Sequence, residues 1–206
     1  MNLFPFYEDI SGKTFLVAGG GSVARRKVAV LMRFTDRITV VAEETDITEV
    51  PVIKKRFEKA DLDLGDYVVA ATGNPAADEE IARLCREAGK KVNVVDQPAL
   101  CSFIFPAVLK RGPLVVSVST SGASPAYAGM LKERVAEMLP GNIEEILLRM
   151  EKLRALVPEL LSRQEDRAAL YRAVLLEELS GHAVTEKEAR SMAEKTASGP
   201  HPTRFP

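Results

Sequence analysis

The chain has 206 residues, of which 46% are hydrophobic and 28% are charged, a composition typical of a globular protein with a buried core. Its formal net charge of −1 argues against a general affinity for nucleic acid or for an anionic membrane. No apolar run approaches the ~20 residues that span a bilayer, the first residues lack a signal-peptide pattern, and the two cysteines make no disulfide framework. We therefore expect a cytoplasmic protein that binds neither nucleic acid nor a membrane.

A glycine-rich turn lies between the first predicted strand and the first predicted helix. Four apolar residues at 15–18 predict a short buried strand, and apolar residues recur with helical spacing from Val23 onward. Between them, Gly19, Gly21 and Ala24 fit the pattern G-x-G-x-x-G/A. In this pattern the first glycine permits a tight turn, the second lets a pyrophosphate approach the backbone, and the helix N-terminus favours the anion. The turn predicts a dinucleotide site, and a strand–helix turn that binds nothing is the alternative.

Acidic residues follow the second predicted strand, at 37–42. Glu43 and Glu44 lie roughly 20 residues beyond the glycines, where dinucleotide sites place an acid that accepts hydrogen bonds from the adenosine ribose. Such an acid would repel a 2′-phosphate, so we expect NAD rather than NADP. Solvated surface acids after a strand are the alternative interpretation.

Two more buried strands are predicted at 67–71 and 91–95. Thr72 and Gly73 follow the first of them, and Asp96 follows the second. Because ligands bind where the carboxyl ends of parallel strands meet, we expect Thr72 and Gly73 beside the cofactor. Asp96 is a candidate for chemistry at the same edge, and an aspartate that merely caps the turn before a proline is the alternative.

The second half of the chain changes in character. Two β-rich runs, at 101–105 and 114–119, precede Ser124-Pro125, which is typical of a helix start and predicts a helix at 126–139. Beyond Gly141 the strand signal fades and apolar residues recur with helical spacing, which predicts three or four helices.

Five motifs of this chain stand in the order, and nearly at the spacing, found in precorrin-2 dehydrogenases, the dehydrogenase module of siroheme synthase. They are Gly19-Gly-Gly-Ser-Val-Ala-x-Arg-Lys27, Ala70-Ala-Thr72, Asn93-Val-Val-Asp96, Ser102-Phe103 and Ser119-x-Ser-Gly-x-Ser-Pro125. The sequence resembles this family over about residues 1–140, and the helical remainder matches in length and class alone.

The resemblance implies an α/β protein with an N-terminal Rossmann-type parallel sheet, a middle α+β segment through which a homodimer forms, and a C-terminal all-helical domain. We accordingly expect an NAD-binding domain at 1–112, a dimerisation segment at 113–140, a helical domain at 141–196 and a disordered tail at 197–206.

The resemblance also implies a reaction, the oxidation of precorrin-2 to sirohydrochlorin with NAD, to which some members add the insertion of ferrous iron. Asp96 takes the place of the acid that the family requires. Ser22 and Val23 match its pyrophosphate contacts, although Ser22 departs from the aspartate found there in some members. Asn93 and Ser124 match positions that face the tetrapyrrole, and the serine is a phosphorylation site in some members. No metal held by several protein ligands is expected.

Two other questions stay open at this point. Basic residues that could answer the substrate's carboxylates are Arg25, Arg26, Lys132 and Arg134, each of which has an ordinary solvated helix face as its alternative. A dehydrogenase acting on another small molecule, or a non-catalytic NAD-sensing module, is the alternative function.

Overall fold

The computed structural model describes residues 3–198, and the chain divides into two compact units. The first contains the chain up to Pro106 together with Ser119–Pro125, and the second contains Ala107–Val118 and the chain from Ala126 onward. The predicted boundary after residue 112 falls in the turn of a hairpin whose two strands both belong to the second unit. Of the predicted tail, Ala197 and Ser198 end the last helix, and residues 199–206 lie outside the described part of the chain.

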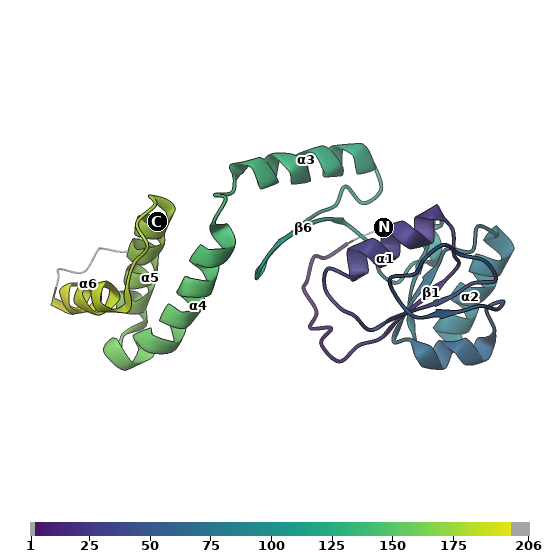
Figure 1. Ribbon diagram of the computed structural model, residues 1–206, viewed down its shortest axis with the longest axis horizontal. Helices are drawn as coiled ribbons and strands as arrows, with labels where there is room; N and C mark the ends of the chain where they lie inside the picture. Colours follow the sequence, from purple (N-terminus) through teal and green to yellow (C-terminus); the bar gives the residue numbers. More distant parts are fainter. Residues whose placement is uncertain (1–2, 199–206) are drawn as a thin grey trace. The chain divides into compact units, whose positions relative to one another are not determined.

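A five-stranded sheet in the order β3-β2-β1-β4-β5 forms the centre of the first unit (Figure 1). Its strands are β1 (Phe15–Ala18), β2 (Ile38–Val41), β3 (Val52–Ile53), β4 (Tyr67–Ala70) and β5 (Lys91–Val94). Every pairing is parallel, so all the strands end at the same edge. The predicted α/β fold with a Rossmann-type parallel sheet is therefore confirmed.

Two helices, α1 (Ser22–Leu31) and α2 (Pro75–Glu87), cover opposite faces of this sheet (Figure 1). Phe15 and Val17 of β1 pack in the cluster that contains the buried residues of α1, whereas Leu16 and Ala18 pack with those of α2. A strand buried on both faces needs a continuous apolar run, which explains why this segment does not alternate with polar residues.

The β-rich run at 101–105 is not a strand, so this prediction was wrong. Phe103 and Phe105 pack against the cluster on the α1 face instead. Ser102 connects this segment to β5 through its backbone N–H, which donates to the Val92 carbonyl oxygen at 2.8 Å, while its hydroxyl accepts from the Val92 N–H at 2.7 Å. The packing of these two rings and the hydrogen bonds between Ser102 and Val92 therefore hold this segment in place of regular strand pairing.

The second unit contains an antiparallel hairpin and, from Ala126 onward, the C-terminal helices (Figure 1). The elements of this part of the chain are β6 (Ala107–Arg111), β7 (Leu114–Val118), α3 (Pro125–Met138), α4 (Ile143–Leu160), α5 (Gln164–Leu179) and α6 (Glu186–Ser198). Leu153, Val157, Leu170 and Val174 belong to one apolar cluster shared by the last three helices. The predicted C-terminal helices are thus confirmed, and within residues 3–198 no helix has the length and apolar character needed to cross a membrane.

Candidate active site

The glycine turn joins β1 to α1 at the carboxyl edge of the sheet. Gly19 has φ +122°, and a Cβ there would lie 2.0 Å from the Ala71 carbonyl oxygen. Only glycine therefore allows the ends of β1 and β4 to approach this closely. Gly21 differs, because a Cβ at that position would meet no atom within 4 Å. Its α-carbon faces open space just before the helix.

The N-terminus of α1 lacks a side-chain cap. Gly21 is the N-cap residue and makes no side-chain capping bond, and the first turn contains no acidic residue. The first-turn N–H groups, which have no partner inside the helix, and the positive end of the helix dipole are therefore available to an external anion. Ser22 is exposed and Val23 is half-buried at this point. An open glycine beside an uncapped helix start fits a dinucleotide pyrophosphate.

The loop after β2 lies against this turn. The Thr45 hydroxyl donates to the Gly20 carbonyl oxygen at 3.0 Å, a contact that sequence analysis did not predict. Glu43 and Glu44 are exposed at the start of the loop, beside the strand that precedes the glycines. Both acids therefore lie at the same sheet edge as the helix N-terminus.

Arg25 is engaged within the protein. Its guanidinium lies 2.6 Å from the Asp46 carboxylate and 3.7 Å from that of Glu49. The hydrogen bond to Asp46 raises the pKa of Arg25 and, in return, lowers the pKa of Asp46. Arg25 is predicted as a candidate for binding the substrate's carboxylates. A carboxylate bound there would have to compete with Asp46 and Glu49 for the guanidinium.

The loop after β4 is held by a buried carboxylate. Asp78 of α2 is 4% exposed and accepts hydrogen bonds from the Thr72 N–H at 3.0 Å and from the Thr72 hydroxyl at 2.8 Å. Asn74 caps α2 by accepting from the N–H groups of the two residues after Pro75. Gly73, at φ +77°, turns the chain between them. Thr72 and Gly73 are therefore placed at the sheet edge, and Asp78 is the positioning residue that sequence analysis missed.

Asp96 follows β5 at the same edge and has an unusual backbone. Its φ is +58°, in the left-handed region, which costs a non-glycine residue roughly 1–2 kcal/mol, although aspartate tolerates it better than most. Its side chain is exposed, and no donor or cation among the described residues lies within bonding distance of its carboxylate. The Gln97 N–H closes the turn by donating to the Val94 carbonyl oxygen at 3.4 Å. The aspartate carboxylate therefore makes no hydrogen bond or ion pair with a described residue, although Lys27 is close enough to interact with it electrostatically.

Asn93 leaves a buried acceptor without a partner. The side chain is 6% exposed, and its Nδ2 donates to the Phe103 carbonyl oxygen at 3.0 Å. Its Oδ1 is buried, and no donor in the described part of the chain reaches it. Buried polar atoms are nearly always paired, so this atom calls for a ligand donor.

Ser124 belongs to a short segment, Ser119–Pro125, that is part of the first unit although the strand before it and most of the helix after it are not. Ser121 and Gly122 both adopt left-handed conformations, with φ +54° and +89°. The Ser124 N–H donates to the Thr120 hydroxyl at 2.9 Å. The segment therefore places Ser124 in the same compact unit as Asp96 and the glycine turn.

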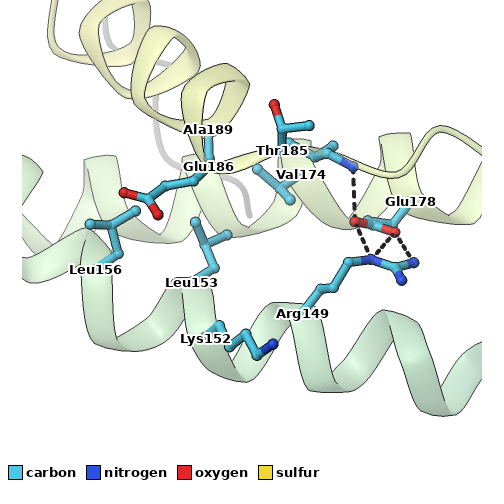
Figure 2. Close-up of a pocket in the computed structure, with 10 residues that line it drawn as sticks. Arg149, Lys152, Leu153, Leu156, Val174, Glu178, Thr185, Glu186 and Ala189 are labelled. Atoms are coloured by element: carbon cyan, nitrogen blue, oxygen red, sulfur yellow. Dashed lines mark hydrogen bonds and ion pairs between the residues drawn. The ribbon is translucent and has the colours of Figure 1, made fainter.

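The helical unit has a cavity of about 250 Å³ between α4, α5 and α6 (Figure 2). A buried ion pair lies at one end of it, where Glu178, 2% exposed, accepts from Arg149 Nη2 at 2.6 Å and Nε at 2.9 Å, and from the Val184 N–H at 3.0 Å. The bond from Arg149 holds the pKa of Glu178 below its usual value. None of the predicted site residues lines this cavity. Between residues 3 and 198 there is no cluster of three or more His, Cys, Asp or Glu side chains that could bind a metal ion.

The fold and the glycine turn together define a nicotinamide-dinucleotide-binding domain of the Rossmann class. The family model described as "Putative NAD(P)-binding" matches residues 6–107. A second model, described as "Sirohaem biosynthesis protein central", matches residues 111–138.

Individual relatives agree with these matches. Siroheme synthase from Thioalkalivibrio sulfidiphilus is 36% identical over 172 residues, which cover 77% of this chain and 35% of the relative. Siroheme synthase from Nitrosomonas eutropha is 34% identical over 184 residues, covering 85% of this chain and 39% of the relative. The chain thus spans little more than a third of the length of these relatives. Among solved structures, "SirC, precorrin-2 dehydrogenase" superposes with a TM-score of 0.75 at 20% identity, covering 96% of this chain and 100% of that one, which shows the shared fold.

The chain is thus a homologue of the siroheme synthases over little more than a third of their length, and it combines a putative NAD(P)-binding domain with a segment found in the central part of sirohaem biosynthesis proteins.

Proposed function

We propose that this chain oxidises precorrin-2 to sirohydrochlorin with NAD as the hydride acceptor. The observation that carries the proposal is Asp96, an unengaged carboxylate in a left-handed backbone at the sheet edge that also bears the glycine turn. The names of the relatives, siroheme synthase and precorrin-2 dehydrogenase, supply the substrate.

The loops that follow β1, β2 and β4 would share the binding of the cofactor. The open space at Gly21 and the N–H groups at Ser22 and Val23 would hold the pyrophosphate. The loop at Thr72 and Gly73, fixed by Asp78, would line the same edge. Bound there, the nicotinamide supplies the hydride acceptor.

The preference for NAD over NADP is a further part of this proposal. Glu43 and Glu44 are both exposed after the strand next to β1, and neither forms an ion pair with a described residue. Carboxylates at this place accept from ribose hydroxyls and repel a 2′-phosphate. Arg25, whose guanidinium contacts the loop that follows these acids, is already paired with Asp46 and Glu49.

The chain's own contribution to the chemistry is the handling of a proton. Desaturation of the macrocycle removes one hydride and one proton, so a base must accept the proton. Asp96 is the candidate for that base, because its carboxylate has no competing donor among the residues described and lies at the ligand-binding edge. Asn93 Oδ1 and Ser124 would orient the tetrapyrrole.

A homodimer built through residues 113–140 is also proposed. Within residues 3–198 no third strand joins the β6–β7 hairpin, and a two-stranded hairpin is marginal on its own in water. All five residues of β7 are only half-buried within the chain. Pairing with a second copy would cover this hairpin. Insertion of ferrous iron stays a prediction of the family resemblance.

The test is a purified chain mixed with precorrin-2 and NAD, in which the spectra of sirohydrochlorin and NADH are followed together. We expect Asp96→Asn to lower kcat by about 100-fold or more with an unchanged melting temperature, because asparagine tolerates the left-handed backbone but cannot take the proton. Asp36→Asn, an exposed acid just before β2, is the matched control and should behave as wild type.

Each alternative has its own outcome. Wild-type protein that binds NAD but forms no sirohydrochlorin would point to a non-catalytic NAD-sensing module or to another substrate. Full turnover by Asp96→Asn would remove Asp96 from the reaction.

A further inference from the structure

Lys27, on α1, is a half-buried cation without an anionic partner. Its Nζ lies 4.2 Å from the centroid of the Phe105 ring. Within residues 3–198 no carboxylate lies at ion-pair distance from it, whereas Arg25, two residues earlier on the same helix, has two such partners. Burial lowers the pKa of Lys27, while the nearby groups of Cys101 and Asp96 act in the opposite direction. An ammonium is strongly hydrated, so partial burial against a ring leaves it short of hydrogen-bond acceptors.

A second unpartnered polar group, on Asn93, is connected to this cation through Phe103 and Phe105. Cys101, which acts electrostatically on Lys27, has its Sγ 3.6 Å from Asn93 Nδ2. The rings of Phe103 and Phe105 are also in contact, with centroids 5.6 Å apart. Asn93 and Lys27 therefore line one region on the α1 side of the sheet.

The orientation of the Asn93 amide is determined by its neighbour. Nδ2 must face the Phe103 carbonyl oxygen, because a flipped amide would bring two acceptors together. The atom left over is therefore an acceptor, Oδ1, and it is buried without a donor from any described residue. Such an atom needs an N–H or O–H group from a ligand.

An unpaired cation and an unpaired acceptor select a particular ligand chemistry. The ammonium calls for a carboxylate or phosphate, and the amide oxygen calls for an N–H donor. A tetrapyrrole has N–H groups at its centre and carboxylates at its rim, so one molecule supplies both. A simple packing role for Lys27, with its stem against Phe105, would explain the ring contact but not the unpartnered Asn93 Oδ1 beside it.

We propose that Lys27 is a further substrate-binding residue, whose ammonium binds a rim carboxylate of the tetrapyrrole next to Asp96 and Asn93. This inference rests on the proposed function, since it takes the tetrapyrrole from there. Lys27 would bind the substrate, and Asp96 would accept the proton that the substrate loses.

The experiment measures equilibrium binding of sirohydrochlorin, the product of the proposed reaction, at low and high salt without oxygen, so it does not require turnover. Lys27→Gln should weaken this binding by about 10- to 100-fold, the range expected for a lost charge-assisted hydrogen bond. It should also flatten the salt dependence and leave NAD binding and the melting temperature unchanged. Lys27→Arg keeps the charge and the stacking on Phe105, and should bind within about threefold of wild type.

Arg37→Gln is the matched control, because it removes one exposed positive charge at the start of β2, the opposite end of that strand from the ligand-binding edge. It should bind sirohydrochlorin as wild type does. Wild-type affinity in Lys27→Gln would overturn the proposal, and so would an equal loss of NAD and sirohydrochlorin binding or an equal loss in Arg37→Gln. Wild-type protein that binds no sirohydrochlorin would overturn it as well. Protein that binds sirohydrochlorin through Lys27 but does not oxidise precorrin-2 would instead refute the proposed function alone.

Discussion

Two glycines of the same turn should respond differently to the same substitution. A methyl group at position 19 would lie 2.0 Å from the Ala71 carbonyl oxygen, and the backbone there has φ +122°. A methyl group at position 21 would meet no atom within 4 Å, and φ there is −80°, which alanine adopts without strain. We therefore predict that Gly19→Ala damages both the fold and cofactor binding, whereas Gly21→Ala damages cofactor binding alone.

The magnitudes follow from these geometries. For Gly19→Ala, a glycine-only backbone conformation costs about 1–3 kcal/mol, and forcing the end of β4 away costs a similar amount, so the free energy of unfolding should fall by about 4 kcal/mol. For Gly21→Ala, the gain from a stiffer unfolded chain and the loss from a poorer N-cap residue nearly cancel, which leaves a change within about 1 kcal/mol. The same methyl would occupy the space through which a pyrophosphate reaches the helix N-terminus, so the Kd for NAD should rise at least about tenfold.

Urea unfolding measures the first quantity, and a calorimetric titration with NAD measures the second. Gly21→Ala that is stable and binds NAD like the wild type would refute the assignment of this turn to the pyrophosphate. Gly19→Ala as stable as the wild type would refute the claim that β1 and β4 approach too closely there for any side chain.

Two other predictions concern charge. Replacing both Glu43 and Glu44 with glutamine should shift the ratio of kcat/KM from NAD towards NADP by about tenfold, and an unchanged ratio would separate these acids from the ribose site. Glu178→Gln should lower the free energy of unfolding at neutral pH by about 1–3 kcal/mol, because Arg149 loses its charged partner. Since folding lowers the pKa of Glu178, this stabilisation is present above the ordinary glutamate pKa and is lost as the pH falls through the folded value. The free energies of unfolding of wild type and variant, measured in urea, should therefore converge once the pH has fallen below the lowered pKa of Glu178, and a gap that persists in acid would contradict the ionic origin of the effect.

Local patterns were sufficient for the elements that carry the cofactor turn. Three local signals lie within a few residues of one another: the apolar run at Phe15–Ala18, the glycines, and the helical periodicity after Val23. The structure has β1 and α1 where these signals predict a strand and a helix. The spacing Thr185-x-x-Glu188 is likewise a local signal, typical of a helix start. In the structure the Glu188 carboxylate accepts from the Thr185 N–H at 2.8 Å, and the Glu188 N–H donates to the Thr185 hydroxyl at 3.3 Å.

Contacts between distant segments could not be read in this way. The run at Cys101–Phe105 has strand-like composition, yet its two rings are partly buried against the α1 face, and this packing outweighs local β-propensity. Asp78 lies in the first turn of α2, where an acid is common, and no pattern of neighbouring residues indicates that it holds the loop at Thr72. Arg25 looked like a free cation, but the loop after β2 brings Asp46 to it.

The candidate site shows the same division. Gly19, Gly21 and Asp96 could be singled out from their order along the chain, because strand ends and glycine spacing are properties of adjacent residues and parallel strands end at one edge. Neither the left-handed backbone of Asp96 nor the unpartnered Oδ1 of Asn93 is encoded in a pattern of neighbours. The ammonium of Lys27 comes to lie over the Phe105 ring only when segments almost 80 residues apart pack together. Tertiary packing decides which polar groups are buried and which of them are left for a ligand, because it alone determines what surrounds each side chain.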